Sequence, residues 1–178
     1  MVILGKSLVV LLLIFVLDNY LQIKAKDMKK YILLIAIVFT VFKAQAQSNC
    51  GEVKAIKQVI ESAYLDGVQN IGDMDKINAG FHPDFRMQVL AEDGRLSNVS
   101  FEKFKEMVRH NIADGILPRK MGQFVKLKYL NIDVCNNAAS VKIDYILNGK
   151  SVYIDYMQLY KFPEGWKIVN KIYYTVGD

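Results

Sequence analysis

The residues best suited to chemistry in this sequence are a histidine and a tyrosine, His82 and Tyr64. Histidine changes charge near neutral pH, so His82 could act as a general base or hydrogen-bond a ligand. Placed before Pro83, it could equally hold a turn between a helix and a strand. Tyr64 lies on an apolar helical stripe, where it could donate to a ligand oxyanion or pack in the core. The sequence therefore leaves enzymatic activity open.

A second polar pair, Tyr156 and Asn170, falls in the long strands near the C-terminus. A polar residue in the middle of an apolar sheet face suggests the wall of a pocket. There the pair could bind a carbonyl or ring nitrogen of a ligand. In the other interpretation Asn170 is buried and satisfied by the Tyr156 hydroxyl, because buried polar groups need partners.

Asp155 and Lys171 are the charged residues closest to this pair. The strand register predicted below turns both away from the interior, as an ion pair on the outer face. A shift of one residue would bring them inside and make them the best acid–base candidates. With no acidic residue on the predicted inner face, proton transfer of the ketosteroid isomerase kind is disfavoured.

Three helices should precede the main sheet. Apolar residues at helical spacing predict a first helix from an Asn49 cap to about Ile71. Asp73 should cap a short second helix over residues 74–79, and Phe81-His82-Pro83-Asp84 should form a turn. Ser100 should cap a third helix, which ends at Asp114-Gly115.

The remaining segments are strand-like, and the last four are long. We expect strands over residues 85–90, 96–99, 124–135, 139–147, 150–160 and 166–176. A change in apolar phase near Tyr129-Leu130 predicts a β-bulge, which would bend the sheet strongly. Helices must cover one face, so the fold class is α+β: three N-terminal helices packed on a strongly curved antiparallel sheet.

A hairpin register assigns the two faces of this sheet. We pair Leu147 with Lys150 across an Asn-Gly turn, and Tyr160 with Trp166. The inner face then collects Val141, Ile143, Tyr145, Ile154, Tyr156, Ile168, Asn170 and Ile172. The outer face keeps a large apolar surface, which predicts a homodimer through Tyr153, Met157, Leu159, Val169 and Tyr173.

The front of the chain has the features of an export signal. Residues 28–46 combine a basic start at Met28, an apolar run and a small-x-small site ending at Ala46. We expect residues 1–27 to be an over-extended gene-model segment, and residues 47–178 to be one mature domain, periplasmic or secreted. In the rival interpretation the two short apolar runs form a membrane anchor, although neither reaches spanning length. Cleavage would leave no stable membrane insertion.

Charge and cysteine content exclude several classes of function. The first 46 residues hold six of the 23 Lys and Arg and two of the 18 Asp and Glu, so the mature part is nearly neutral. This balance gives no support for nucleic-acid binding, which usually needs a clustered basic face. A Cys50–Cys135 disulfide stays open beside two unpaired thiols. Without a His/Cys cluster we expect no metal site, and no cofactor either.

Two motifs resemble a known family. Gly165-Trp166-Lys167-Ile168-Val169-Asn170-Lys171, with Phe81-His82-Pro83-Asp84-Phe85 upstream, is similar to the putative lumazine-binding family of the nuclear transport factor 2-like superfamily. The resemblance covers about Val53 to Val176. It implies a cone-shaped α+β barrel with a pocket inside the cone. The superfamily includes isomerases, dehydratases, cyclases and binding modules, so the fold does not decide the function.

The leading interpretation is an exported homodimer whose cone binds a small, partly aromatic molecule. The residues expected to bind this ligand are Tyr64, His82, Phe85, Met87, Tyr145, Tyr156 and Asn170. The alternative is an isomerase, dehydratase or cyclase that uses His82 as general base and Tyr64 as donor. In a third interpretation aromatic side chains fill the cone, and the domain only binds a partner protein.

Overall fold

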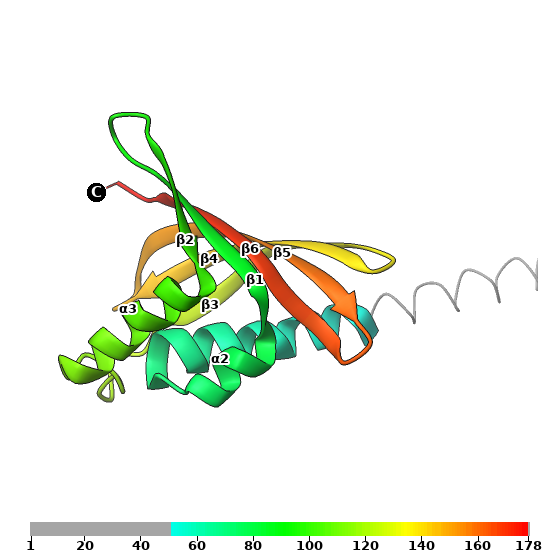
Figure 1. The fold of residues 1–178 in the computed structure, drawn as a ribbon. Coiled ribbons are helices and arrows are strands. Elements are labelled where there is room, and N and C mark those ends of the chain that lie inside the picture. Colours follow the sequence, from blue (N-terminus) through cyan, green and yellow to red (C-terminus); the bar gives the residue numbers. More distant parts are fainter. Residues whose placement is uncertain (1–50, 178) are drawn as a thin grey trace, which may run out of the picture. The chain divides into compact units, whose positions relative to one another are not determined.

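A long first helix lies against one face of the sheet. A computed structural model describes residues 51–177, and the fold is drawn in Figure 1. Residues 51–59 are α-helical, and the helix continues as the π-helix η1 (Ile60–Ile71), in which each N–H bonds the carbonyl five residues back. Gly72 ends the helix with a φ of 83°, a left-handed conformation that glycine adopts without a Cβ penalty. The predicted Asn49 cap lies outside the described residues.

Two shorter helices follow where the capping residues predicted them. Asp73 accepts hydrogen bonds from the backbone N–H groups of Asp75 and Lys76, and α2 spans Met74–Gly80. Ser100 accepts from the backbone N–H of Lys103, and α3 spans Phe101–Ala113. The side-chain oxygens satisfy N–H groups that have no partner inside the helix, so both predicted caps are confirmed.

The six strands form one sheet in the order β2-β1-β6-β5-β4-β3. Their bounds are β1 (Phe81–Leu90), β2 (Leu96–Ser100), β3 (Lys126–Cys135), β4 (Ala138–Leu147), β5 (Lys150–Phe162) and β6 (Gly165–Thr175). Strands β1 and β6 are parallel, and every other neighbouring pair is antiparallel. The sheet is curved but not closed, with the helices on one side (Figure 1), which confirms the α+β class.

The predicted turn over residues 81–84 is wrong, because these residues open β1. Phe81 pairs with Ile168 in the parallel β1–β6 ladder.

The predicted bulge in β3 is confirmed: Tyr129 pairs with Ile143 and Asn131 with Lys142, which leaves Leu130 without a partner in β4.

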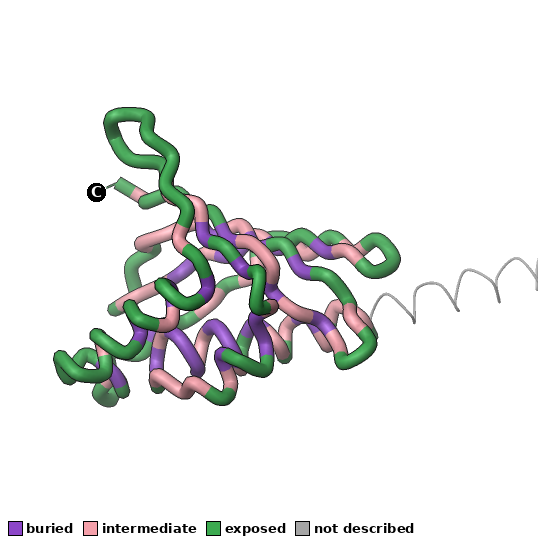
Figure 2. The backbone as a smooth tube through the Cα atoms, viewed as in Figure 1, coloured by how far each residue is buried: buried purple, intermediate pink, exposed green. Residues whose placement is uncertain are grey.

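The core lies between the helices and the sheet. Figure 2 shows buried residues where the first helix and the strands face each other, whereas the loop between β1 and β2 is exposed along its length. Four phenylalanines from α3 and β1 form one end of this core, with ring centroids 4.8 to 6.3 Å apart: Phe81, Phe85, Phe101 and Phe104. These rings pack against one another, and Phe104 also borders the cavity described below.

Candidate functional site

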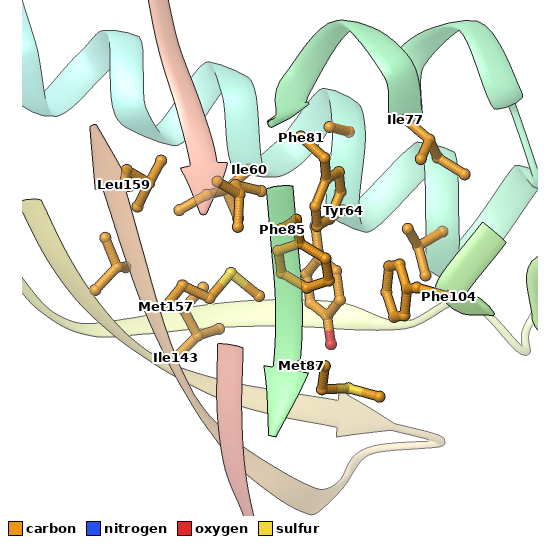
Figure 3. Close-up of a cluster of buried hydrophobic side chains, with 14 of the residues drawn as sticks. Ile60, Tyr64, Ile77, Phe81, Phe85, Met87, Phe104, Ile143, Met157 and Leu159 are labelled. Atoms are coloured by element: carbon orange, nitrogen blue, oxygen red, sulfur yellow. The ribbon is translucent and has the colours of Figure 1, made fainter. Parts of the chain in front are cut away.

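A cavity of about 300 Å³ lies between the first helix, α3 and the sheet. Aromatic and aliphatic side chains make most of its wall, with a few polar groups among them. The lining residues are Tyr64, Val68, Gln69, Met87, Phe104, Met107, Val108, Asn111, Tyr145, Tyr153, Lys171 and Tyr173. Figure 3 shows Tyr64 reaching from the first helix with its hydroxyl oxygen toward Met87. Small-molecule sites typically begin at about 300 Å³ and have such walls.

A buried ion pair stands at the sheet side of this cavity. Lys171 Nζ lies 2.8 Å from Asp155 Oδ1, and the two residues are 6% and 0% exposed. Tyr64 donates a hydrogen bond of 2.6 Å to Asp155 Oδ2. We call these three residues the Tyr64–Asp155–Lys171 cluster. Tyr64 and Lys171 line the cavity directly.

One oxygen of this cluster keeps free capacity to accept a proton or a hydrogen bond. Asp155 Oδ1 is buried and accepts no aligned hydrogen bond from the described residues. Its 2.8 Å separation from Lys171 Nζ nevertheless falls within the usual range for an ammonium beside a carboxylate. The contact is therefore a close ion pair, at the separation of a charge-assisted hydrogen bond.

Burial sets the protonation behaviour of the cavity wall. Burial, and then the neighbouring Asp155 carboxylate, raise the pKa of Tyr64 well above its ordinary value, so its hydroxyl remains a donor. Burial lowers the pKa of Lys171, against the opposing effect of Asp155. The Lys171 ammonium also lies over two aromatic rings, 5.3 Å from the Tyr64 centroid and 4.8 Å from that of Tyr173.

Three tyrosines from neighbouring strands make the sheet side of the aromatic wall, beside Tyr64 and Phe104 from the helices. Tyr145, Tyr153 and Tyr173 meet edge to face, with centroids 5.4 and 5.3 Å apart. The Tyr145 hydroxyl donates to Gln69 Oε1 at 3.0 Å, which ties the wall to the end of the first helix. Burial raises the pKa of Tyr145, so this hydroxyl also stays protonated. A flat ring entering the cavity would meet ring faces and edges together.

Two bulges decide which residues face the cavity. The predicted pairing of Leu147 with Lys150 is confirmed, but Tyr145 pairs with Tyr153, which leaves Val152 without a partner in β4. Each extra residue reverses the faces of the strand beyond it.

The second bulge lies in the last hairpin. Gln158 pairs with Asn170 and Leu159 with Ile168, so Val169 has no partner in β5. Trp166 pairs with Lys161, and the predicted pairing of Trp166 with Tyr160 is wrong. The predicted inward placement of Ile154, Tyr156, Asn170 and Ile172 is consequently reversed, and Asp155 and Lys171 lie inside.

The structure brings together three of the seven residues that the sequence assigned to a ligand. Tyr64, Met87 and Tyr145 line the cavity. Phe85 is buried among the core phenylalanines instead. Tyr156 lies on the outer face, under the ammonium of Lys142, and Asn170 lines a separate hollow there.

His82 lies away from the cavity, at the start of β1. Its Nδ1 accepts a hydrogen bond of 3.1 Å from the backbone N–H of Asp84, and its ring stacks on Phe162 with centroids 4.7 Å apart. These contacts fix the start of β1 against the end of β5. This position gives no support to a role as general base.

The surface predicted for dimerisation faces mostly inward. Met157 and Leu159 are 0% and 1% exposed and belong to the core, and Tyr153 and Tyr173 line the cavity. The bulge at Val152 is the cause, because it turns the alternate residues of β5 toward the helices. The outer face instead carries other apolar residues: Ile154, Tyr156, Ile172 and Tyr174.

Sequence reasoning missed the contribution of α3 to the cavity. Phe104, Met107, Val108 and Asn111 lie on one side of this helix and all line the cavity. Their spacing of three and four residues was visible, but the same stripe is also what a core-packing helix shows.

Other kinds of site find little support in the part of the chain described. Residues 51–177 contain no group of three or more His, Cys, Asp and Glu that could hold a metal ion. No helix in that range is both long and apolar enough to cross a membrane. Cys135 is exposed, and Cys50 lies outside the described residues, so their disulfide stays open.

A family model described as putative lumazine-binding matches residues 51–174. None of the curated proteins matches the chain.

Solved structures share the fold at low sequence identity. An NTF2-like protein of unknown function from Shewanella baltica is 24% identical, with a TM-score of 0.58 over 72% of this chain and 97% of that one. An NTF2-like protein of unknown function from Silicibacter pomeroyi is 16% identical, with a TM-score of 0.59 over 72% and 98%.

A third similar structure has a described activity. A protein from Novosphingobium aromaticivorans, described as a putative aromatic ring hydroxylase, is 15% identical, with a TM-score of 0.51 over 72% of this chain and 92% of that one. At these identities the likeness concerns the fold alone, and the fold is NTF2-like.

Proposed function

The chain belongs to the putative lumazine-binding family, and from that premise we propose that its cavity binds a small, partly aromatic molecule. The observation that carries the proposal is the cavity of about 300 Å³ whose wall joins three tyrosines to the buried ammonium of Lys171. A largely apolar cavity with a few convergent polar groups is the usual form of a small-molecule site.

The tyrosine wall favours a planar ring. Tyr145, Tyr153 and Tyr173 stand edge to face, so an inserted ring can continue the same arrangement on either side. Aromatic pairs of this geometry contribute roughly 0.5–1.5 kcal/mol beyond the area they bury. Met87 and Val108 supply aliphatic contacts in the same cavity.

The Tyr64–Asp155–Lys171 cluster favours a ligand with a hydrogen-bond acceptor and no net negative charge. Lys171 has three N–H donors, and among residues 51–177 it pairs with Asp155 alone, so N–H capacity remains for a ligand carbonyl or ring nitrogen. Asp155 already neutralises the ammonium charge. A ligand carboxylate would have to compete with Asp155 for the ammonium in a buried position, at a cost in desolvation.

Filling the cavity mouth should abolish binding while the fold is retained. Met107 lines the cavity but is 45% exposed, so Met107→Trp can place an indole at the mouth without overfilling the core. We expect bicyclic aromatic compounds with one carbonyl or ring nitrogen to raise the melting temperature of the wild-type domain and to leave the variant unchanged.

The matched control for this experiment is Met121→Trp. Met121 is 94% exposed and is not part of the cavity wall, so the added indole should not affect binding. Equal ligand-induced stabilisation of the wild-type protein and Met107→Trp would contradict the proposed site.

We also propose that the domain is exported and forms a homodimer through the outer face of the sheet. The export signal over residues 28–46 lies outside the described residues, and an exported protein that begins at Gln47 is the expected product. The dimer surface would be the cross-strand pairs Ile154–Tyr174 and Tyr156–Ile172, of which Ile172 is 42% exposed. Apolar patches of this kind usually mark an interface.

A charge on this face should separate the dimer. Ile172→Glu would bury a carboxylate without a partner in the interface, so we expect a monomer by native mass spectrometry where the wild-type protein gives a dimer. Met121→Glu, on an exposed loop, is the control and should remain dimeric. A wild-type monomer at micromolar concentration would contradict this assembly.

A further inference from the structure

Lys171 is the one lysine among residues 51–177 that is buried. Its amine stands in the wall of an aromatic cavity, within 5.3 Å of the Tyr64 ring centroid and 4.8 Å of the Tyr173 centroid. Its side chain is only 8% exposed, whereas a lysine such as Lys161 forms its ion pair at 44% exposure. A small molecule would thus reach this amine through the cavity.

The partner of Lys171 lies within proton-transfer distance of its amine. Asp155 Oδ1 is 2.8 Å from Lys171 Nζ and receives no aligned hydrogen bond from residues 51–177. Burying two charges is costly, so transfer of one proton from the ammonium to Oδ1 exchanges a charged pair for a neutral one in the same place. Burial also lowers the pKa of Lys171, which works in the same direction. A neutral lysine amine is a nucleophile toward carbonyl carbon.

We propose that Lys171 captures aromatic aldehydes or ketones in the cavity as a reversible imine, with Asp155 as the proton carrier. This inference rests on the proposed function, because the same cavity must first admit an aromatic molecule. It adds a class of ligand, the aromatic carbonyl compounds, and a covalent mode of binding.

The steps balance without any oxidant or reductant. Asp155 takes a proton from the ammonium, and the free amine attacks the carbonyl carbon, so that a C–N bond forms and the carbonyl electrons move to oxygen. That oxygen receives a second proton from the attacking nitrogen. The nitrogen lone pair then expels the hydroxyl group, which leaves as water with the proton held by Asp155. The product is a protonated imine beside the Asp155 carboxylate, so the buried pair keeps its charges.

Tyr64 is the positioning residue of this reaction. Its hydroxyl donates to Asp155 Oδ2 at 2.6 Å, which fixes the carboxylate and leaves Oδ1 directed at Lys171. With a pKa raised well above the ordinary value, Tyr64 stays a donor throughout and does not compete for the proton.

The test is reductive trapping with 2-naphthaldehyde. Sodium cyanoborohydride delivers hydride to the imine carbon and makes the adduct permanent, and peptide mass mapping finds the modified lysine. At limiting aldehyde we expect Lys171 to be labelled at least about tenfold faster than Lys142, because binding holds the carbonyl beside the amine. Lys142 is the matched comparison, since it also lies over a tyrosine ring, 5.3 Å from the Tyr156 centroid, but on the outer face.

Two variants and one analogue keep the outcomes distinct. Lys171→Arg keeps the positive charge beside Asp155 and should lose the adduct, whereas Lys142→Arg should keep it. 2-Naphthalenemethanol has the same rings but no carbonyl, so it reports non-covalent binding by thermal shift. If the alcohol stabilises the protein but Lys171 is labelled no faster than Lys142, the imine proposal is overturned. The proposal that the cavity binds aromatic molecules would then still stand. Absence of both stabilisation and preferential labelling would overturn both.

Discussion

Asp155→Ala should lower the free energy of unfolding by about 3–5 kcal/mol, because it leaves the Lys171 ammonium buried without a partner. Asp155 is 0% exposed, and its two oxygens face Lys171 Nζ and the Tyr64 hydroxyl. The substitution thus removes one charge and also strands a donor. Urea unfolding monitored by circular dichroism at neutral pH measures this loss.

A double variant separates the charge effect from the loss of packing. Asp155→Leu together with Lys171→Met removes both charges and keeps the volume, and such replacements are often neutral or stabilising. We expect it to recover the part of the stability lost in Asp155→Ala that is due to the unpaired ammonium, while the Tyr64 hydroxyl still lacks its acceptor. Lys142→Met, on the outer face, should change stability by less than about 0.5 kcal/mol. If Asp155→Ala were no more harmful than Lys142→Met, the buried pair would not contribute as described.

Gly80→Ala should be destabilising by about 1–3 kcal/mol, because no space exists for the added methyl group. A Cβ at Gly80 would lie 2.2 Å from Ala63 Cβ on the first helix, far inside van der Waals contact. Either α2 or the first helix would have to move, and η1 carries Tyr64 of the cavity wall. Thermal unfolding measures the cost, and the ligand-induced shift would report any displacement of Tyr64.

The reciprocal substitution tests whether this contact is the cause. Ala63→Gly removes the methyl group that the new Cβ meets, so Ala63→Gly with Gly80→Ala should be more stable than the sum of the single variants predicts. The single variant Ala63→Gly alone costs about 1 kcal/mol from helix propensity. If the changes in unfolding free energy of the two single variants simply add, the contact with Ala63 is not the cause of the destabilisation by Gly80→Ala.

Local chemistry made much of the fold predictable. Asp73 and Ser100 begin α2 and α3 because their side-chain oxygens satisfy free N–H groups at the helix starts. The bulge at Leu130 was visible as a change of phase between two clean apolar alternations. The α+β class follows from these elements, since the long strands need helices to cover one face.

The two bulges that shape the site left no comparable signal. Around Val152 and Val169 both faces of the strands carry large apolar or aromatic residues. Shifting the register by one therefore replaces Ile154 and Tyr156 on the inner face by Tyr153 and Met157, and the alternation of apolar residues looks equally good. The register that we derived from the two turns, which contained neither bulge, placed both charged residues on the outer face. Asp155 and Lys171 enter the interior only as a pair, and pairing across two strands cannot be read from either strand alone.

The central claim, that the cavity binds a small aromatic molecule, is tested most directly by native mass spectrometry of the domain exported to and purified gently from the periplasm. The wild-type protein should carry an additional small mass that denaturation releases for identification, and Met107→Trp prepared in parallel should carry none. A mass retained equally by Met107→Trp would contradict the site, and a wild-type domain that carries no added mass and takes up no aromatic compound would contradict the function.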